Sequence, residues 1–241
     1  MKSRTTACFA ALILLIISCK KENSTIQSSG ITNENSTQVI SSEANELAGV
    51  HAVRIGTQVW KIKNLNVSNY RNGDLIPQVK NPAKWATLTT GAWCWYNNDS
   101  ANGAVYGKLY NWYAVTDPRG LAPEGWHIPS DAEWTTLSTF LGGDAVAGGK
   151  MKSTGTIETG TGLWYAPNTN ATNSSGFKGL PGGYRFYNGR FTLIGYYGYW
   201  WSSTEVDATR AGVRGLDSHS RGCSGGSYYK LAGNSVRCLR D

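Results

Sequence analysis

GWHIPSDAEWTTLSTFLGG, residues 125–143, contains the clearest helix signal in the sequence, and the rest of the fold can be worked out from it. Ser130 and Glu133 have the spacing of a capping box, in which two side chains satisfy backbone N–H groups at the start of a helix. Apolar residues from Trp134 to Leu141 then repeat at the spacing of one helix face, and the Gly-Gly pair that follows commonly ends a helix. The stretch predicts an amphipathic helix that packs on a core through Trp134.

Strand patterns lie on both sides of this helix. Residues 51–65, HAVRIGTQVWKIKNL, read as two short strands around a Gly-Thr turn. Residues 182–195 read as a hairpin around Asn188-Gly189, and SVRCLRD at 235–241 alternates like a strand. Helices early and strands late in the chain predict the α+β class.

A second helix is predicted at YGKLYNWYAV, residues 106–115, with Leu109, Trp112 and Tyr113 on one face. Residues 142–182 are rich in Gly, Thr and Asn. We expect them to form long connections that are anchored by aromatic residues such as Trp164 and Phe177.

The N-terminus has the layout of a secretory signal. A basic head precedes an apolar run from Ala7 to Ile17, which is too short to span a bilayer and ends at Ser18-Cys19. IISC resembles the lipobox of bacterial lipoproteins, which implies a signal peptide at 1–19 and a lipid on Cys19. Residues 20–50 are polar and lack aromatic side chains, so we expect a disordered tether followed by one domain at 51–241.

The charge balance does not indicate nucleic acid as a partner. The formal net charge is +7, and it would fall to +5 when Lys2 and Arg4 leave with the signal. The remaining basic residues are scattered rather than clustered, and an exported, tethered protein rarely meets nucleic acid. We expect a membrane partner through the lipid anchor instead.

Cysteine use allows at most one disulfide in the mature domain. Without Cys8 in the signal and Cys19 at the lipid, Cys94, Cys223 and Cys238 remain. An oxidising compartment permits one bond among them but does not select the pair.

No set of residues has the pattern of a catalytic or metal site. His127 precedes the predicted helix and could be a base, but a structural histidine is the better interpretation, and Glu133 is explained as a capping residue. WYNND at 95–99 superficially resembles a lectin calcium motif but lacks its partner tripeptide. Glu205 and Asp207 are interpreted as solvated loop charges. We therefore expect no catalytic residues, no metal and no cofactor.

The run DSHSRGCSGGSYYK, residues 217–230, contains no aliphatic residue. Its Ser, Gly and Tyr composition is typical of a paratope, in which aromatic rings provide area and small residues provide adaptability. An ordinary Gly- and Ser-rich surface loop has the same composition. Both interpretations predict a loop whose side chains face solvent and in which Cys223 is incidental.

Five blocks of the chain resemble the Fibrobacter succinogenes major paralogous domain family and occur in the family's order. They are IGTQVWKIKNLNV, YGKLYNWYAV, GWHIPSDAEW, GYWWSSTE and GNSVRCLRD. The family resembles the C-type-lectin-like fold, in the variant of formylglycine-generating enzymes. The resemblance implies an α+β domain with two helices, a twisted antiparallel sheet and long loops. It also implies Cys94–Cys238 as the disulfide, because both cysteines lie in family-like blocks.

Lectin-like proteins of this kind include targets of diversity-generating retroelements, which rewrite adenines in the codons of a C-terminal variable region. Every residue from Asp217 to Tyr229 belongs to the set that can arise from Asn codons. The resemblance therefore implies a ligand-binding surface in this part of the chain. Its candidate residues are Arg210, Val213, Ser218, His219, Arg221, Ser224, Ser227, Tyr228 and Tyr229.

These observations lead to one main hypothesis and two alternatives. The main hypothesis is an outer-membrane lipoprotein, exposed at the cell surface, whose lectin-like domain binds a protein or glycan through a C-terminal surface that is hypervariable. The alternatives are an enzyme related to formylglycine-generating proteins and a structural envelope lipoprotein without a dedicated ligand. The absence of a nucleophile–base set favours a protein that is not an enzyme.

Overall fold

The computed structural model describes residues 46–47 and 51–241, all within one compact unit that spans Ser41–Asp241. The predicted signal peptide, the lipidation of Cys19 and most of the tether lie outside the described residues. Within the described part of the chain, no helix has both the length and the apolar character needed to cross a membrane.

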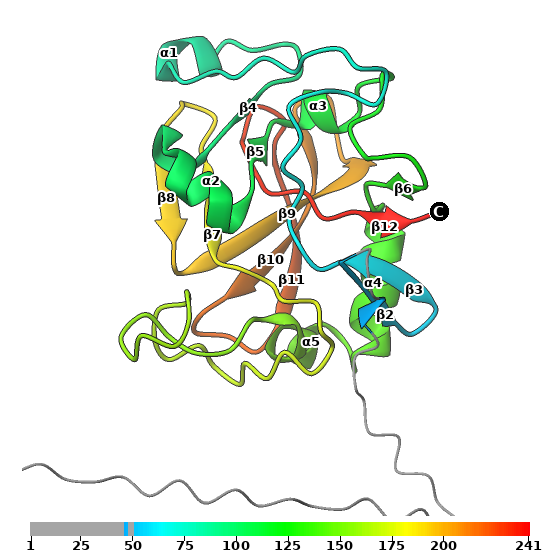
Figure 1. Ribbon diagram of the computed structural model, residues 1–241, viewed down its shortest axis with the longest axis vertical. Coiled ribbons are helices and arrows are strands. Elements are labelled where there is room, and N and C mark those ends of the chain that lie inside the picture. The colour runs from blue at the N-terminus through cyan, green and yellow to red at the C-terminus, as the bar shows by residue number, and fades with distance from the viewer. Residues whose placement is uncertain (1–45, 48–50) are drawn as a thin grey trace, which may run out of the picture. The chain divides into compact units, whose positions relative to one another are not determined.

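One antiparallel sheet brings the two ends of the domain together. Its order is β1-β2-β3-β12-β6, so the first hairpin lies beside the last strand (Figure 1). The hairpin turns at Gly56-Thr57, as the sequence predicts, and Leu239 pairs with Trp60 on one side and with His127 on the other. The terminal strand is shorter than predicted. The bounds are Glu46–Leu47 (β1), Ala52–Ile55 (β2), Gln58–Lys61 (β3), Trp126–His127 (β6) and Leu239–Arg240 (β12).

A second five-stranded sheet forms the late part of the domain, in the order β11-β10-β9-β7-β8. All its pairs are antiparallel except β7 with β9, and the predicted hairpin at Asn188-Gly189 joins β7 to β8. Its long strands are visibly curved (Figure 1). The bounds are Gly182–Arg185 (β7), Phe191–Ile194 (β8), Tyr197–Glu205 (β9), Arg210–Asp217 (β10) and Cys223–Tyr229 (β11); β4 (Trp93–Cys94) and β5 (Leu109–Tyr110) form a separate pair.

The described residues contain five α-helices, where two were expected. They are α1 (Pro82–Trp85), α2 (Ser100–Tyr106), α3 (Trp112–Val115), α4 (Asp131–Phe140) and α5 (Asp144–Met151), with a 3-10 turn, η1, at Tyr96–Asn98. The predicted helix at 106–115 is wrong. Gly107 turns the chain at φ 78°, β5 follows, and the Asn111 side chain accepts a hydrogen bond from the Ala114 N–H to start the short α3. The α+β class and the twisted, mostly antiparallel sheet are confirmed.

Helix α4 follows the sequence prediction closely. Ser130 and Glu133 form the capping box, and the Trp134 side chain is 1 % exposed. Its ring lies 4.6 Å from that of Trp60 and 5.9 Å from that of Phe177. The helix therefore joins the first sheet to the aromatic core, as its apolar face predicts.

Helix α5 lies inside the segment that was expected to be an irregular connection, and that expectation is corrected. Its sequence, DAVAGGKM, contains two adjacent glycines, which lower helix propensity. Tertiary contact explains them, because a Cβ on Gly148 would lie 1.8 Å from the Gly222 carbonyl oxygen. The anchors Trp164 and Phe177 are fully buried, as predicted.

Candidate functional site

The polar run at 217–230 forms the turn and the second strand of a β-hairpin rather than a loop. Strands β10 and β11 pair residue by residue from Arg210↔Tyr229 to Leu216↔Cys223, and only residues 218–222 form the turn. Successive side chains of a strand point to opposite faces of a sheet. One face of the hairpin is buried. On the other face Ala211 and Val213 are buried as well, whereas Ser224 and Tyr228 are not, so the expectation that all its side chains face solvent is wrong.

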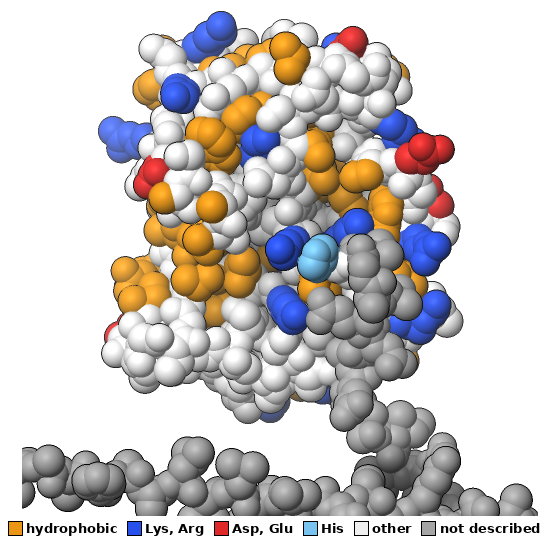
Figure 2. Space-filling view, viewed as in Figure 1, with side chains coloured by type: hydrophobic (Ala, Val, Ile, Leu, Met, Phe, Trp, Pro, Cys, Tyr) orange, Lys and Arg blue, Asp and Glu red, His pale blue; other side chains and the backbone are white. Residues whose placement is uncertain are grey.

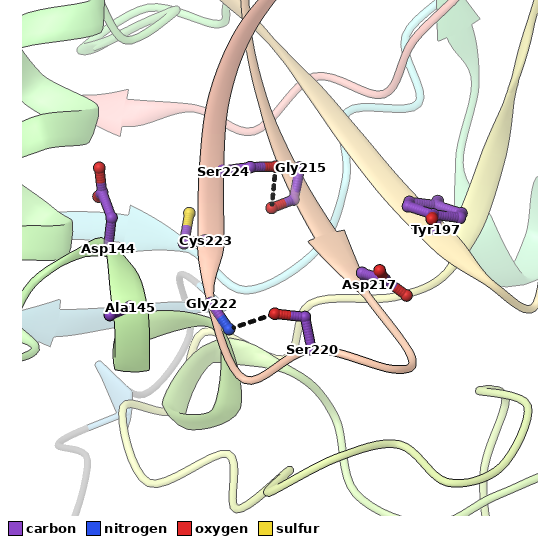
Figure 3. Close-up of a pocket in the computed structure, with 9 residues that line it drawn as sticks. All are labelled: Asp144, Ala145, Tyr197, Gly215, Asp217, Ser220, Gly222, Cys223 and Ser224. Carbon is purple, nitrogen blue, oxygen red and sulfur yellow. Dashed lines mark hydrogen bonds between the residues drawn. The ribbon is translucent and has the colours of Figure 1, made fainter.

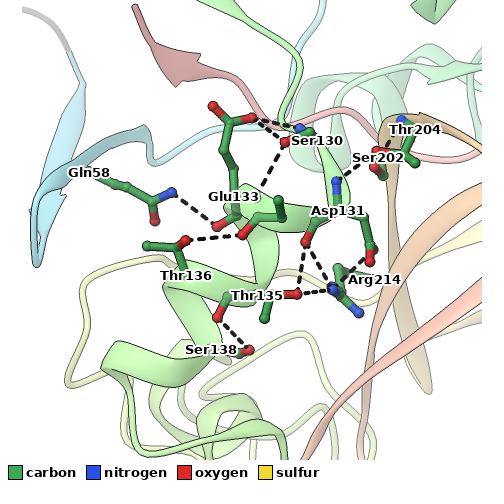
Figure 4. Close-up of polar contacts among 11 residues, drawn as sticks. Gln58, Ser130, Asp131, Glu133, Thr135, Thr136, Ser138, Ser202, Thr204 and Arg214 are labelled. Atoms are coloured by element: carbon green, nitrogen blue, oxygen red, sulfur yellow. Dashed lines mark hydrogen bonds and ion pairs between the residues drawn. The ribbon is translucent and has the colours of Figure 1, made fainter.

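The buried face of the hairpin packs against α4 and α5. Leu216 and Cys223 lie in the same core cluster as Trp134. Arg214 reaches across to α4, where its Nη2 atom lies 3.0 Å from Asp131 Oδ1 and donates to Thr135 Oγ1 at 2.8 Å (Figure 4). Gly225 leaves room for this guanidinium, because a Cβ there would lie 1.9 Å from Arg214 Nη1.

Two of the nine predicted ligand-binding residues belong to the core. Val213 is 2 % exposed in a hydrophobic cluster, and Ser218 is fully buried, with its backbone bonded to Thr169 and Tyr196. These two predictions are wrong, because Val213 packs in the cluster that Tyr199 and Tyr228 partly cover and the turn directs Ser218 inward. The other seven are exposed or half-buried: Arg210, His219, Arg221, Ser224, Ser227, Tyr228 and Tyr229.

A continuous band of aromatic rings lies on the other face of the second sheet. Tyr184 is buried in it, Tyr197, Tyr199 and Tyr228 are half-buried, and Tyr187 and Tyr229 are exposed. Tyr199 on β9 is central to it, with ring centroids 5.6 Å from Tyr197, 5.4 Å from Tyr184 and 5.3 Å from Tyr228. The band continues around the edge of the sheet, because Tyr187 lies 4.7 Å from Tyr229. We call this surface the aromatic band; its members are Tyr184, Phe186, Tyr187, Tyr197, Tyr199, Tyr228 and Tyr229.

The hydroxyl groups at the centre of the band act together. Burial raises the pKa of Tyr184, Tyr199 and Tyr228 above the usual range, and hydrogen bonds join the Tyr228 hydroxyl to the other two. All three phenols are therefore protonated at neutral pH. They present uncharged donors and acceptors next to apolar ring surface, which is the combination that makes tyrosine common in binding sites.

A pocket of about 340 Å³ opens at the hairpin turn, at the Tyr197 end of the band (Figure 3). Tyr197 and Asp217 line one side, and Asp144 and Ala145 from α5 line the other. The remaining lining residues are small: Gly215, Ser220, Gly222, Cys223 and Ser224.

Lys152 holds the turn beside this pocket in place. Its fully buried side chain donates to the Asp217 carbonyl at 2.8 Å and to the Ser220 carbonyl at 2.7 Å. Burial lowers the pKa of Lys152 to about 8, and the nearby Asp217 carboxylate opposes that shift. A second contact, from the Gly149 N–H to the Arg221 carbonyl at 2.8 Å, ties the turn to α5. The pocket therefore has a firmly supported floor.

The chain matches the Fibrobacter succinogenes major domain over residues 53–240, a range that includes the second sheet, most of the first sheet, the aromatic band and the pocket. It belongs to this family. The resemblance predicted from the five sequence blocks is thus confirmed. No curated protein and no solved structure matches the chain significantly.

The predicted Cys94–Cys238 disulfide is not formed in the major domain. All three of its described cysteines are free and buried, with Cys94 and Cys238 in separate core clusters. Burial raises the pKa of each thiol to about 12, although Arg185 beside Cys94 and Arg214 near Cys223 oppose the shift. Both cysteines lie in family-like blocks, but two residues in such blocks need not lie close together in space.

His127 of the major domain has a structural environment. Its Nδ1 atom lies 2.7 Å from Asp241 Oδ1 and its Nε2 atom 2.9 Å from Glu133 Oε1. Burial lowers its pKa, but the two carboxylates outweigh burial and leave it raised. The ring thus joins the C-terminal residue to α4. No group of His, Cys, Asp and Glu side chains within the described residues is arranged to hold a metal.

The sequence interpretation missed Tyr184, Tyr197 and Tyr199 as site residues. The signal was present in YYGYWWSST, where Tyr197 and Tyr199 alternate with the buried Gly198 and Trp200. Tyr184 could not be placed in this way, because the parallel pairing of β7 with β9 that brings it to Tyr199 is a tertiary feature. Glu205 is also better described now, since it pairs with the buried Lys230 at 2.6 Å.

Proposed function

We propose that this chain is a lipid-anchored surface protein whose major domain binds a macromolecular ligand through the aromatic band. The observation that carries the proposal is the band itself, because contiguous aromatic rings that are left partly open to solvent mark interaction sites. Tyr187 and Tyr229 are among its most exposed large side chains, at 39 % and 40 %. Figure 2 shows a related feature of the surface, with hydrophobic side chains gathered over β7, β8 and α2 and basic ones scattered.

The construction of the site supports recognition rather than turnover. The band lies on strands whose opposite face is packed against α4 and α5, so ligand contacts form on a preorganised surface. The alternative of an enzyme related to formylglycine-generating proteins would need a reactive cysteine. Buried thiols with a pKa of about 12 are protonated at neutral pH and are poor nucleophiles.

The resemblance of the family to C-type-lectin-like proteins supports a ligand-binding role. It also supports diversification of the surface. If these codons vary, variation should fall on the exposed hairpin positions Arg210, His219, Arg221, Ser224 and Ser227. Val213 and Ser218 should stay constant because they are buried. A near-repeat of this coding end beside a reverse transcriptase gene, differing at adenines in those exposed codons, would be the supporting observation.

The binding experiment uses a soluble chain that starts at Ser41, so that β1 is kept, and that is displayed on beads. Tyr199→Ala combined with Tyr228→Ala should abolish capture of partners from surface extracts, since interface energy concentrates in a few aromatic and Arg residues. Phe140→Ala is the matched control, because Phe140 is an exposed aromatic residue on α4, away from the band. Equal capture by the double variant and the control would contradict the proposal.

The anchoring part of the proposal has its own test. Cys19→Ser should release the full-length protein from the membrane fraction after signal cleavage, because the acyl chains supply the only anchor that the proposal invokes. A processed variant that still sediments with membranes would rule out the lipid anchor.

A further inference from the structure

We propose that the pocket at the hairpin turn and the adjoining aromatic band together bind a neutral glycan. One sugar ring would occupy the pocket, and the following rings would stack along the band. This inference rests on the proposed function and adds the chemical class of the ligand.

Two tyrosine rings form a stacking surface at the mouth of the pocket. The rings of Tyr197 and Tyr199 are parallel to within 3°, with centroids 5.6 Å apart, and both are half-buried. Tyr199 lies flat on the sheet, because a Cβ added to Gly215 beneath it would come 2.8 Å from its Cε1 atom. Because residue 215 is glycine, the Tyr199 ring can lie flat on the sheet with its π-face, rather than its edge, pointing outward. The C–H face of a pyranose is apolar and gains dispersion contacts on such a surface.

The pocket has a lining of carboxylate and hydroxyl groups. Asp144 and Asp217 supply carboxylates from opposite walls, and the Ser220 and Ser224 hydroxyls lie between them. The Asp144 carboxylate has no hydrogen bond or ion pair to any other described residue, whereas Asp217 Oδ1 already accepts from the His219 N–H at 2.8 Å. Charged acceptors form strong hydrogen bonds with hydroxyl donors, and a sugar offers several of these around one ring.

The charged side chains that line the pocket are all acidic. The pocket is lined by two carboxylates and no cation, and the Lys152 ammonium group is engaged by backbone carbonyls beneath the turn. Like charges brought together are unfavourable, which excludes phosphorylated, sulfated or acidic sugars as occupants. A basic side chain would satisfy the pocket, but it would leave the uncharged band unused. A chain of neutral, hydroxyl-rich rings uses both parts of the surface.

The test is calorimetric titration of the chain from Ser41 with four neutral linear probes: maltohexaose, cellohexaose, xylohexaose and mannohexaose. At least one should bind, with nearly the same affinity at about 0.1 M and about 1 M salt, because a neutral ligand is not screened. A peptide of alternating Ala and Arg serves as the cationic comparison. Binding of that peptide with strong salt dependence, in place of the glycans, would overturn the inference.

Variants separate the two halves of the site. Asp144→Asn should weaken the bound hexasaccharide about tenfold or more, because hydrogen bonds to charged groups are the strong ones. Tyr197→Ala should weaken it to a similar extent, and Tyr197→Phe should leave affinity almost unchanged because the stacking face remains. Phe140→Ala should bind as the parent does. The thermal midpoint of each variant establishes that it is folded, and Tyr197→Phe keeps the test available if Tyr197→Ala unfolds.

The outcomes distinguish this inference from the proposed function. If none of the four glycans binds but surface partners are still captured through Tyr199 and Tyr228, the glycan inference is wrong and the ligand-binding role stands. If glycan binding is equal in Asp144→Asn, Tyr197→Ala and the parent, the site lies elsewhere. If neither glycans nor surface partners are captured, the proposed function itself fails.

Discussion

Replacing Gly148 by Ala provides a test in which sequence and tertiary structure predict opposite signs. Gly148 lies inside α5, where Ala has a higher helix propensity than Gly by about 1 kcal/mol. Propensity alone therefore predicts a stabilised protein. The structure predicts the reverse, because α5 touches the hairpin turn at this residue.

The magnitude follows from the contacts of the added methyl group. It would lie 1.8 Å from the Gly222 oxygen and 3.0 Å from the Arg221 oxygen, whereas Cβ atoms essentially never come closer than 3.0 Å to other heavy atoms. The helix or the turn must move by roughly 1 Å or more, and the Gly149 N–H to Arg221 carbonyl bond would be lost. Overpacking costs about 1–3 kcal/mol and a lost hydrogen bond about 1 kcal/mol. We expect a net destabilisation of about 1–3 kcal/mol once the gain in propensity is subtracted.

The assay is urea unfolding of the chain from Ser41, followed by tryptophan fluorescence. Ala145→Gly in the same helix is the control, because Ala145 is exposed and its loss should cost only the propensity difference of about 1 kcal/mol. The same variants can be titrated with the glycan probes, since Gly222 lines the pocket. If Gly148→Ala is as stable as the parent or more stable, α5 does not restrain the turn and the reasoning fails.

Four further predictions follow from individual environments. Trp134→Ala should lower the free energy of unfolding by about 3–5 kcal/mol, because the ring is 1 % exposed; an unchanged melting temperature would show that this helix face is not core. Because the pKa of His127 is raised on folding, its contribution to the free energy of unfolding is fully present below pH 6.5 and is lost as the pH rises through the pKa of the folded state. Urea unfolding should show this decline in the parent and not in His127→Asn. An identical decline in both proteins would contradict the prediction. Val213→Asn should cost more than about 1 kcal/mol in thermal unfolding, whereas His219→Asn should stay within about 0.5 kcal/mol; equal effects would place both side chains in solvent. The thiols of Cys94, Cys223 and Cys238 should react with Ellman's reagent only after unfolding, and a fast reaction of the native protein would contradict their burial.

Local signals in the sequence determined several elements of this protein. The capping box at Ser130 and Glu133, the turn at Gly56-Thr57 and the hairpin at Asn188-Gly189 were all predicted and found. Each depends on residues within a few positions of one another, so the physical cause is contained in a short stretch. The family pattern was also readable, because its blocks are local motifs in a set order.

Tertiary structure alone decided the parts that depend on distant segments. The polar run pairs with β10 in a hairpin that has a buried face, because α4 supplies Asp131 for Arg214 on β10 and α5 contacts the turn. The sequence did not predict helix α5, because its glycines lower helix propensity and are explained only by the close approach of Gly148 to Gly222. The aromatic band required the pairing of β7 with β9, and the free cysteines required knowledge of which core cluster each one enters. The strand period shows which residues share a face, but the face that is exposed depends on what the rest of the chain packs against it.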